Sequence, residues 1–229
     1  MHICIFGAGA VGSHLAVRLS LAGHEVSCVT RGPHLEAVKE RGLTLRVGDA
    51  SFNARVKASD DPATLGAQDL VISTLKATGV ANLATGLKPL LGEDTPVVFA
   101  QNGIPWWYDI GLPADHPPSP DLGFLDPGGG LRAAIPKARI IGGVIFSSNE
   151  VVEPGVVANL SPERNMLLVG ACDDRQDVRI ERLRATLNEA SIASQPQRYS
   201  LAGTNMAGLL GCAAGYTYPC RRVPYRQIK

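Results

Sequence analysis

Hydrophobic positions along the first thirty residues change spacing twice. Ile3 to Phe6 is a short apolar run, which is typical of a strand buried on both faces of a parallel sheet. Helical spacing then follows, in Val11, Leu15, Leu19 and Ala22. Gly23 ends this helix, and Val26 to Val29 reads as a second strand. The chain therefore begins with a strand–helix–strand unit.

The same alternation of strands and helices continues to about residue 190. Residues 104–138 hold many Pro and Gly without periodicity, which predicts a long loop. This order of elements predicts an α/β protein with a Rossmann-type, doubly wound, mostly parallel sheet. The predicted helices are Leu35–Arg41, about Val80–Leu91 and Gln176–Ala190; the predicted strands are Asp69–Leu75, Pro96–Ala100, Ile140–Phe146, Val151–Ala158 and Met166–Val169, with a hairpin over Leu43–Val47 and Ser51–Val56.

A glycine-rich turn lies between the first strand and the first helix. It reads Gly7-Ala8-Gly9-Ala10-Val11-Gly12, a G-x-G-x-x-G motif in the strand–turn–helix context that dinucleotide-binding proteins require. Gly7 permits the tight turn, Gly9 lets the backbone approach a pyrophosphate, and Gly12 allows close packing of helix on strand. The N-terminus of the helix supplies free N–H groups and partial positive charge. The motif predicts a bound dinucleotide.

The end of the second strand indicates which dinucleotide. NAD-binding proteins usually place a carboxylate there, whereas this strand ends in Thr30-Arg31. Arg31 can pair bidentately with a 2′-phosphate, and Thr30 adds a hydroxyl donor. The residues favour NADP(H), the alternative being that Arg31 is a solvated charge at the strand end.

Two polar residues follow consecutive core strands. Lys76 comes after Asp69–Leu75, and Asn102 comes after Pro96–Ala100. Ligands of open α/β sheets bind at the carboxyl ends of the strands, so both side chains are candidates for the nicotinamide and substrate end of the site. The alternative is that Lys76 is a surface charge and Asn102-Gly103 an ordinary turn.

Composition limits the other classes of function. The 229 residues carry a net charge of +1, which gives no electrostatic case for nucleic acid, and no apolar run is long enough for a membrane span. Five scattered Cys without a C-x-x-C indicate a reduced, cytoplasmic protein. The five His show no metal-ligand spacing, and we expect most of them to be solvated around the first helix.

Four segments in this order resemble the 2-dehydropantoate 2-reductase (ketopantoate reductase) family. They are GAGAVGSHLAVRLSLAGHEVSCVTRG, STLKA around Lys76, AQNGIPWW around Asn102 and EVVEPGVV, and the match covers roughly residues 1–200. The resemblance implies reduction of the ketone of 2-dehydropantoate to pantoate, for pantothenate and coenzyme A synthesis, with NADPH as the cofactor. It places Gly7, Gly9, Gly12 and Arg31 at NADPH, and Lys76 and Asn102 beside the nicotinamide and substrate.

The resemblance weakens beyond about residue 200. In the family, a lysine on the first helix of a second, all-helical domain donates the proton, and the matching position here is Thr204, with Ala202 at the preceding Trp position. A threonine hydroxyl is a poor general acid near neutral pH. Residues 211–229 lose helical periodicity and carry no acidic side chain. We therefore expect an NADP-binding domain over 1–194 and a truncated, poorly ordered remnant of the helical domain over 195–229.

Three functions stay open at this point. The chain is a ketopantoate reductase with impaired activity, an NADPH-binding remnant or sensor without catalysis, or an NADP-dependent reductase of another small keto acid. The expected partners are a small keto acid and, through the family's second domain, a second copy of the chain in a homodimer. Nucleic acid, membrane and metal are not expected.

Overall fold

Seven strands form the main sheet of the computed structural model, which describes residues 1–76, 79, 83–110, 121–173 and 175–195. They are β1 (His2–Phe6), β2 (Glu25–Val29), β5 (Lys57–Ser59), β6 (Leu70–Ser73), β7 (Val97–Ala100), β8 (Ile140–Ile145) and β11 (Leu167–Ala171). Their order is β11-β8-β7-β6-β1-β2-β5, and all neighbours are parallel except β8 and β11. The strand order reverses beside β1, as in other doubly wound sheets.

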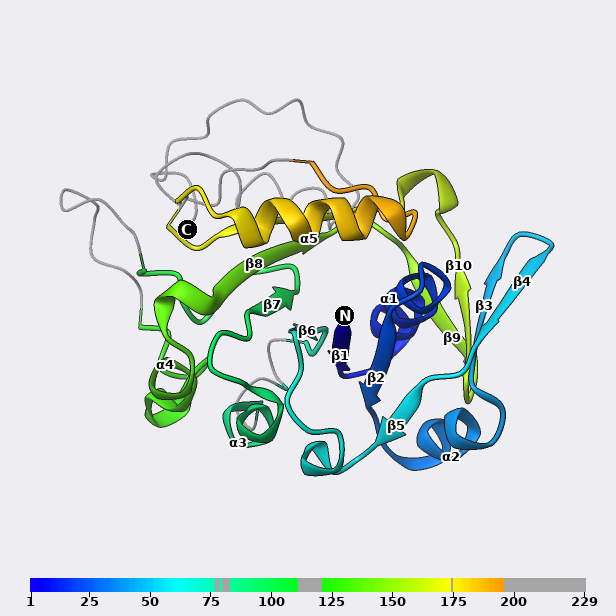
Figure 1. Ribbon diagram of the computed structural model, residues 1–229, viewed down its shortest axis with the longest axis horizontal. Helices are drawn as coiled ribbons and strands as arrows, with labels where there is room; N and C mark the ends of the chain where they lie inside the picture. The colour runs from blue at the N-terminus through cyan, green and yellow to red at the C-terminus, as the bar shows by residue number, and fades with distance from the viewer. Residues whose placement is uncertain (77–78, 80–82, 111–120, 174, 196–229) are drawn as a thin grey trace.

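Helices cover both faces of the main sheet, which confirms the predicted Rossmann-like architecture (Figure 1). On one face lie α1 (Ala10–Leu21) and α5 (Val178–Glu189); on the other lie α3 (Leu83–Leu87) and α4 (Gly130–Ala134). The apolar core is divided accordingly, with Leu15 and Leu183 in one buried cluster and Leu83 and Leu131 in the other. Short 3₁₀ turns occur at Pro62–Thr64, Lys88–Leu90, Pro127–Gly129, Lys137–Arg139 and Pro162–Arg164.

A second, four-stranded sheet packs beside α1 and α2 (Gly32–Arg41) (Figure 1). Its strands are β3 (Leu43–Val47), β4 (Ala50–Ala54), β9 (Asn149–Glu153) and β10 (Val156–Asn159), in the order β4-β3-β10-β9. The predicted hairpin of β3 and β4 is confirmed, and β10 joins it in parallel with Val156 opposite Thr44. Helix α1 contacts strands of both sheets, so it is enclosed on two sides.

The structure corrects three predicted elements. The helix predicted over about Val80–Leu91 is shorter: α3 ends at Leu87 because Pro89 cannot continue an α-helix, and a 3₁₀ turn follows. The strand predicted over Val151–Ala158 is two strands, β9 and β10, since Gly155 takes a φ of 79° in the turn between them. The loop predicted over residues 104–138 contains α4 and buries Trp106 and Trp107 against Phe99, while residues 111–120 lie outside the described part.

His14 contradicts the prediction of solvated histidines. Its side chain is fully buried in α1, where Nε2 lies 3.5 Å from Asn159 Nδ2 and Nδ1 has no hydrogen-bond partner among the residues that the structure describes. The reason is the second sheet, which covers the face of α1 that a helix on a single sheet would expose to water. Burial, with a smaller effect of the Arg18 charge, lowers the pKa of His14 to about 4. His2 is exposed, whereas His24 and His34 are partly buried.

Acidification from pH 7 to pH 5 is expected to lower the free energy of unfolding by about 2 kcal/mol through His14. In the unfolded chain His14 takes up a proton near its ordinary pKa of 6.5, whereas the folded chain keeps it neutral down to about pH 4. The contribution of neutral His14 to the free energy of unfolding is therefore fully present above pH 6.5 and is lost as the pH falls toward 4. Urea unfolding at both pH values measures the change, and His14→Gln is expected to remove this part of it. An equal loss of stability in parent and variant would contradict the prediction.

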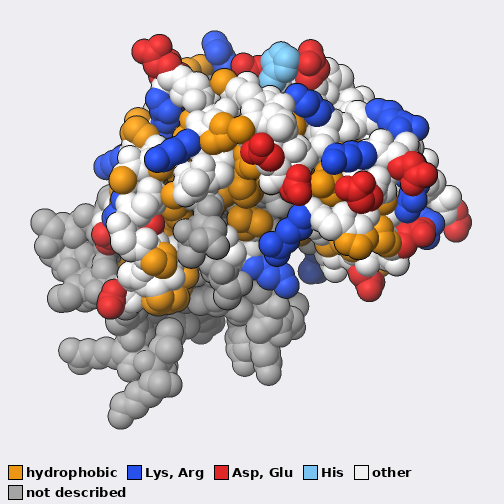
Figure 2. Space-filling model, turned by 90° about the horizontal axis from the view of Figure 1, so that it is seen from below, with side chains coloured by type: hydrophobic (Ala, Val, Ile, Leu, Met, Phe, Trp, Pro, Cys, Tyr) orange, Lys and Arg blue, Asp and Glu red, His pale blue; other side chains and the backbone are white. Residues whose placement is uncertain are grey.

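The boundary predicted at residue 194 stays a prediction. Within the remnant assigned to 195–229, the structure describes only Gln195. No helix in the described part of the chain has the length and apolar character needed to cross a membrane. Acidic and basic side chains are interspersed on the face shown in Figure 2, so no field of a single sign covers that face.

Candidate cofactor-binding site

The glycine-rich turn joins β1 to α1 at the carboxyl edge of the main sheet. The N–H groups of Gly7 and Ala8 both donate to Val29 O, at 3.0 and 3.1 Å, and Gly9 N–H donates to Gly7 O at 2.7 Å. Gly7 takes a φ of 96°, in the left-handed region where a side chain is strained. These bonds tie the turn to the end of β2, so the turn and the residues that follow β2 share one edge of the sheet.

Gly12 is the position at which helix and strand come closest. A Cβ atom there would lie 2.5 Å from Gly7 O and 2.6 Å from Thr74 Oγ1, closer than real Cβ contacts. The Thr74 hydroxyl donates to the same Gly7 carbonyl at 2.6 Å, so the oxygen has little freedom to move. The expected reason for glycine at this position, close packing of the helix, agrees with this geometry. In the sequence, Thr74 stands out only as part of the segment STLKA, and its hydrogen bond to Gly7 O was not predicted.

Gly9 differs from the other two glycines because open space surrounds it. A Cβ atom on Gly9 would meet no atom of the described residues within 4 Å. Beside it, the N–H groups of Ala10, Val11 and Gly12 donate to no acceptor in the described part of the chain, and the first turn of α1 has no acidic residue. Unpaired N–H groups at a helix N-terminus bind phosphate groups, and the open space at Gly9 admits one. The residues present therefore fit the pyrophosphate of a dinucleotide.

Arg31 lies at the start of α2, directly beyond the end of β2. It is the N-cap residue, in extended conformation, and its side chain is exposed. Among the described residues it forms no ion pair or side-chain hydrogen bond. Thr30 is partly exposed, and its N–H donates to Ser59 O at 3.0 Å. The guanidinium is available to a ligand at the edge that carries the glycine-rich turn.

Lys76 and Asn102 follow the neighbouring strands β6 and β7, as the sequence predicts. The Lys76 side chain is exposed and has no ion pair with a described residue. Asn102 uses its amide on the protein: Nδ2 donates to Ile145 O, and Oδ1 accepts from Ile145 N–H, each at 3.1 Å. These two bonds join the chain beyond the end of β7 to the last residue of β8. Contact of either side chain with a nicotinamide stays a prediction.

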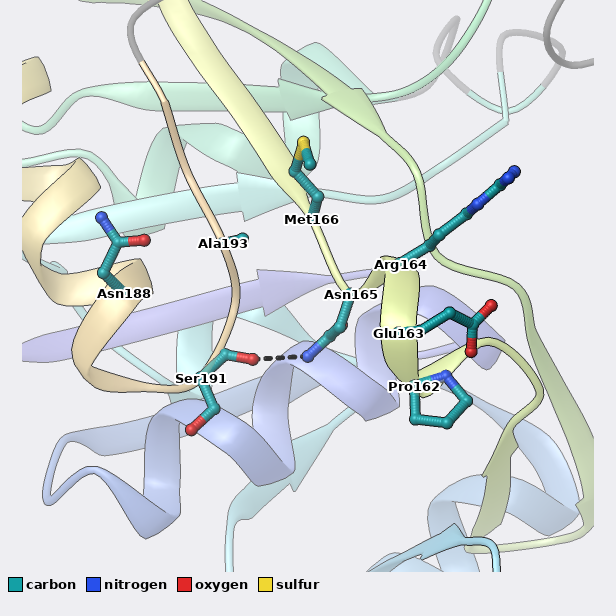
Figure 3. A pocket seen from close by; sticks show the side chains of 8 residues that line it. All are labelled: Pro162, Glu163, Arg164, Asn165, Met166, Asn188, Ser191 and Ala193. Atoms are coloured by element: carbon teal, nitrogen blue, oxygen red, sulfur yellow. Dashed lines mark hydrogen bonds between the residues drawn. The ribbon is translucent and has the colours of Figure 1, made fainter. Parts of the chain in front are cut away.

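A separate pocket of about 370 Å³ opens near the end of α5 (Figure 3). Asn165 Nδ2 donates to Ser191 O at 2.6 Å across it, and none of the predicted site residues lines it. In the described ranges, no group of three His, Cys, Asp or Glu side chains is placed to hold a metal ion. The lining residues are Pro162, Glu163, Arg164, Asn165, Met166, Asn188, Ser191 and Ala193.

Comparison with known proteins relates the N-terminal region of this chain to the ketopantoate reductases. Residues 3–106 match the family model described as ketopantoate reductase PanE/ApbA. The chain is 41% identical to a 2-dehydropantoate 2-reductase of Mesorhizobium japonicum over 72% of this chain and 50% of the relative. It is 28% identical to the 2-dehydropantoate 2-reductase of Pyrococcus horikoshii, over 85% of this chain and 56% of the relative. The chain thus spans about half the length of these curated relatives.

Solved structures agree with these relatives. A protein from Ralstonia solanacearum, assigned to the ketopantoate reductases, superposes with a TM-score of 0.77 at 35% identity, over 84% of this chain and 59% of that one. The 2-dehydropantoate 2-reductase of Geobacter metallireducens gives a TM-score of 0.70 at 28% identity, over 86% of this chain and 58% of that one. The described fold is therefore that of the larger part of such proteins.

Proposed function

We propose, from the ketopantoate reductase (PanE/ApbA) domain that the N-terminal region of this chain carries, that the chain binds NADPH and serves the reduction of 2-dehydropantoate to pantoate. The observation that carries this proposal is the open first turn of α1. Its three N–H groups lack an acceptor among the described residues, and the adjoining Gly9 is surrounded by open space. The substrate is taken from the relatives, which are 2-dehydropantoate 2-reductases.

Each part of the cofactor has a proposed partner at the carboxyl edge of the sheet. The N–H groups of Ala10, Val11 and Gly12 bind the pyrophosphate, and Arg31, with the Thr30 hydroxyl, binds the 2′-phosphate. When bound, NADPH supplies the hydride that reduces the ketone. The chain's own residues fix the position and orientation of the dinucleotide, which is the part of the chemistry that the protein must provide.

Lys76 and Asn102 have different proposed roles at the substrate end. Lys76, exposed and without an ion pair among the described residues, is suited to hold the substrate carboxylate. Asn102 holds β7 to β8 through Ile145, but its amide keeps a second N–H and a second lone pair for a ligand. Asn102 thus fixes the edge of the sheet and can still contact the nicotinamide or substrate.

Arg31→Ala is expected to remove most of the preference for NADPH over NADH. In the parent chain this preference should amount to about 1.5–3 kcal/mol, the usual size of a charge-assisted contact. Isothermal titration calorimetry with both cofactors measures it. Arg182→Ala is the matched control and should leave both affinities unchanged, because this arginine is also exposed and its side chain has no partner among the described residues. Equal affinity of the parent chain for NADPH and NADH would refute the assignment.

A second function is favoured by one residue, Thr204, which stands where the resemblance places the proton-donating lysine. It lies outside the described residues. On this alternative the chain holds NADPH without appreciable turnover. The third, reduction of another small keto acid, is tested by following NADPH oxidation with a panel of 2-keto and 3-keto acids.

A further inference from the structure

Three hydrogen bonds form a continuous chain between α2 and the glycine-rich turn. Gly155 N–H donates to His34 Nδ1 at 3.1 Å, and His34 Nε2 lies 3.2 Å from Ser13 Oγ. Ser13 Oγ in turn donates to Ala8 O, at 3.0 Å. His34 is in the first turn of α2, Ser13 is fully buried in α1, and Ala8 belongs to the G-x-G-x-x-G motif. The chain of bonds therefore connects two helix N-termini.

The partners determine the protonation state of His34. A backbone N–H can only donate, so Nδ1 of His34 is the acceptor and carries no proton. The Ser13 hydroxyl proton is directed to Ala8 O, so Ser13 Oγ accepts and Nε2 of His34 carries the proton. The neutral ring thus uses both nitrogens. Burial lowers the pKa of His34, which favours this neutral form.

The turn at Pro154-Gly155 holds α2 from its other side. Arg41, at the end of α2, donates to Pro154 O at 2.7 Å, and Thr44 N–H donates to Gly155 O at 2.8 Å. With Gly155 N–H bound to His34, this turn contacts α2 near both ends. The only remaining polar link from α2 toward α1 that is recorded among the described residues is the pair of His34 and Ser13.

This link joins the two groups proposed to bind phosphates. Arg31 is the N-cap of α2, three residues before His34, so the two move together as one helical turn. Ser13 is fixed to the glycine-rich turn twice, by its hydroxyl on Ala8 O and by its N–H on Gly9 O at 2.8 Å. A single dinucleotide that contacts both the turn and Arg31 needs a fixed separation between them.

We propose that His34 is a positioning residue for cofactor specificity: it holds Arg31 at the separation from the glycine-rich turn at which one NADPH molecule reaches both. The inference rests on the proposed function. His34 has no role in binding the pyrophosphate itself, because the N–H groups assigned to it belong to α1. Its removal affects the 2′-phosphate contact and thereby the ratio of affinities, rather than affinity for dinucleotides in general.

The test compares affinities for NADPH and NADH by calorimetry. In His34→Leu the ratio of the two affinities should fall about tenfold, while affinity for NADH stays within about threefold of the parent value. His34→Gln should retain most of the ratio, since its amide offers one acceptor and one donor. Ser13→Ala, a smaller change that breaks the same link, should lower the ratio as His34→Leu does and serves if the leucine variant does not fold.

A double variant separates positioning from general stability. If His34 acts through Arg31, adding His34→Leu to Arg31→Ala should leave the ratio of affinities unchanged. The inference is overturned if the ratio is unaffected by His34→Leu and Ser13→Ala, if both cofactors lose affinity equally, or if the ratio falls equally in the Arg31→Ala background. Absence of binding of either cofactor by the parent chain overturns the proposed function and this inference with it.

Discussion

Gly9→Ala is expected to abolish most cofactor binding while leaving the fold intact. The added methyl group would enter open space, and the φ of −80° at Gly9 is accessible to alanine, so the free energy of unfolding should change by less than about 0.5 kcal/mol. The same methyl group would occupy the open space at the turn, which the proposed pyrophosphate needs. Loss of two charge-assisted hydrogen bonds to phosphate should lower the affinity for NADPH about 100-fold or more.

Gly12→Ala is the matched comparison, because there the methyl group is directed into the protein. It would lie 2.5 Å from Gly7 O, which the Thr74 hydroxyl already holds. We expect a loss of about 1–3 kcal/mol in unfolding free energy together with the loss of binding. Thermal unfolding and calorimetry on both variants distinguish the two mechanisms. Undiminished NADPH affinity in Gly9→Ala would show that no phosphate lies at this turn.

Purified chain is expected to bind NADPH but to oxidise it with 2-dehydropantoate only at a trace rate. Reduction of a ketone leaves an alkoxide unless a proton arrives, and loss of a positioned general acid typically costs about 10²–10⁴-fold in rate. By resemblance to the family, the proton-donating lysine would stand at the position of Thr204. This residue lies outside the described part of the chain. Thr204→Lys should raise the rate by a comparable factor only where this segment positions the new ammonium group at the substrate, and it should leave the NADPH affinity unchanged.

Absorbance of NADPH at saturating keto acid measures both rates, and heat-inactivated protein gives the background. Robust, saturable turnover by the parent chain, not increased in Thr204→Lys, would contradict the prediction. Lys76 would then be the proton donor to test, since it is a cation at the carboxyl edge of the sheet. Lys76→Met removes that charge while keeping a side chain of similar length.

Local sequence signals predicted the main sheet well because its elements depend on near neighbours. The run Ile3–Phe6, the glycines after it and the helical spacing up to Ala22 lie within one strand–turn–helix unit, and each signal supports the same structure. The carboxyl-edge position of Arg31, Lys76 and Asn102 followed from strand order alone. Their contacts with cofactor and substrate stay predictions.

The features that sequence reasoning missed all depend on distant contacts. Burial of His14 requires β10, whose last residue, Asn159, lies against the imidazole. The hydrogen bonds of the Asn102 amide require Ile145 of β8. Asn159 and Ile145 are far along the sequence from His14 and Asn102, so no local sequence pattern predicts these contacts. Similarly, Trp106 and Trp107 lie in a stretch of Pro and Gly without periodicity, yet they pack on Phe99 of β7. The contact between the Ser13 hydroxyl and the His34 imidazole likewise joins residues that are distant in the sequence.

The parallel pairing of β10 with β3 has a consequence for how the chain is made. Thr44 and its partner Val156 are separated by more than 100 residues. The residues of the β3–β4 hairpin are therefore synthesised long before those of β10. At about 5–20 residues per second this delay is on the order of ten seconds. During that time β3 presents an unpaired edge, with Leu43 and Leu45 awaiting their final burial. Until β10 emerges, this edge is open to pairing with strands of other chains.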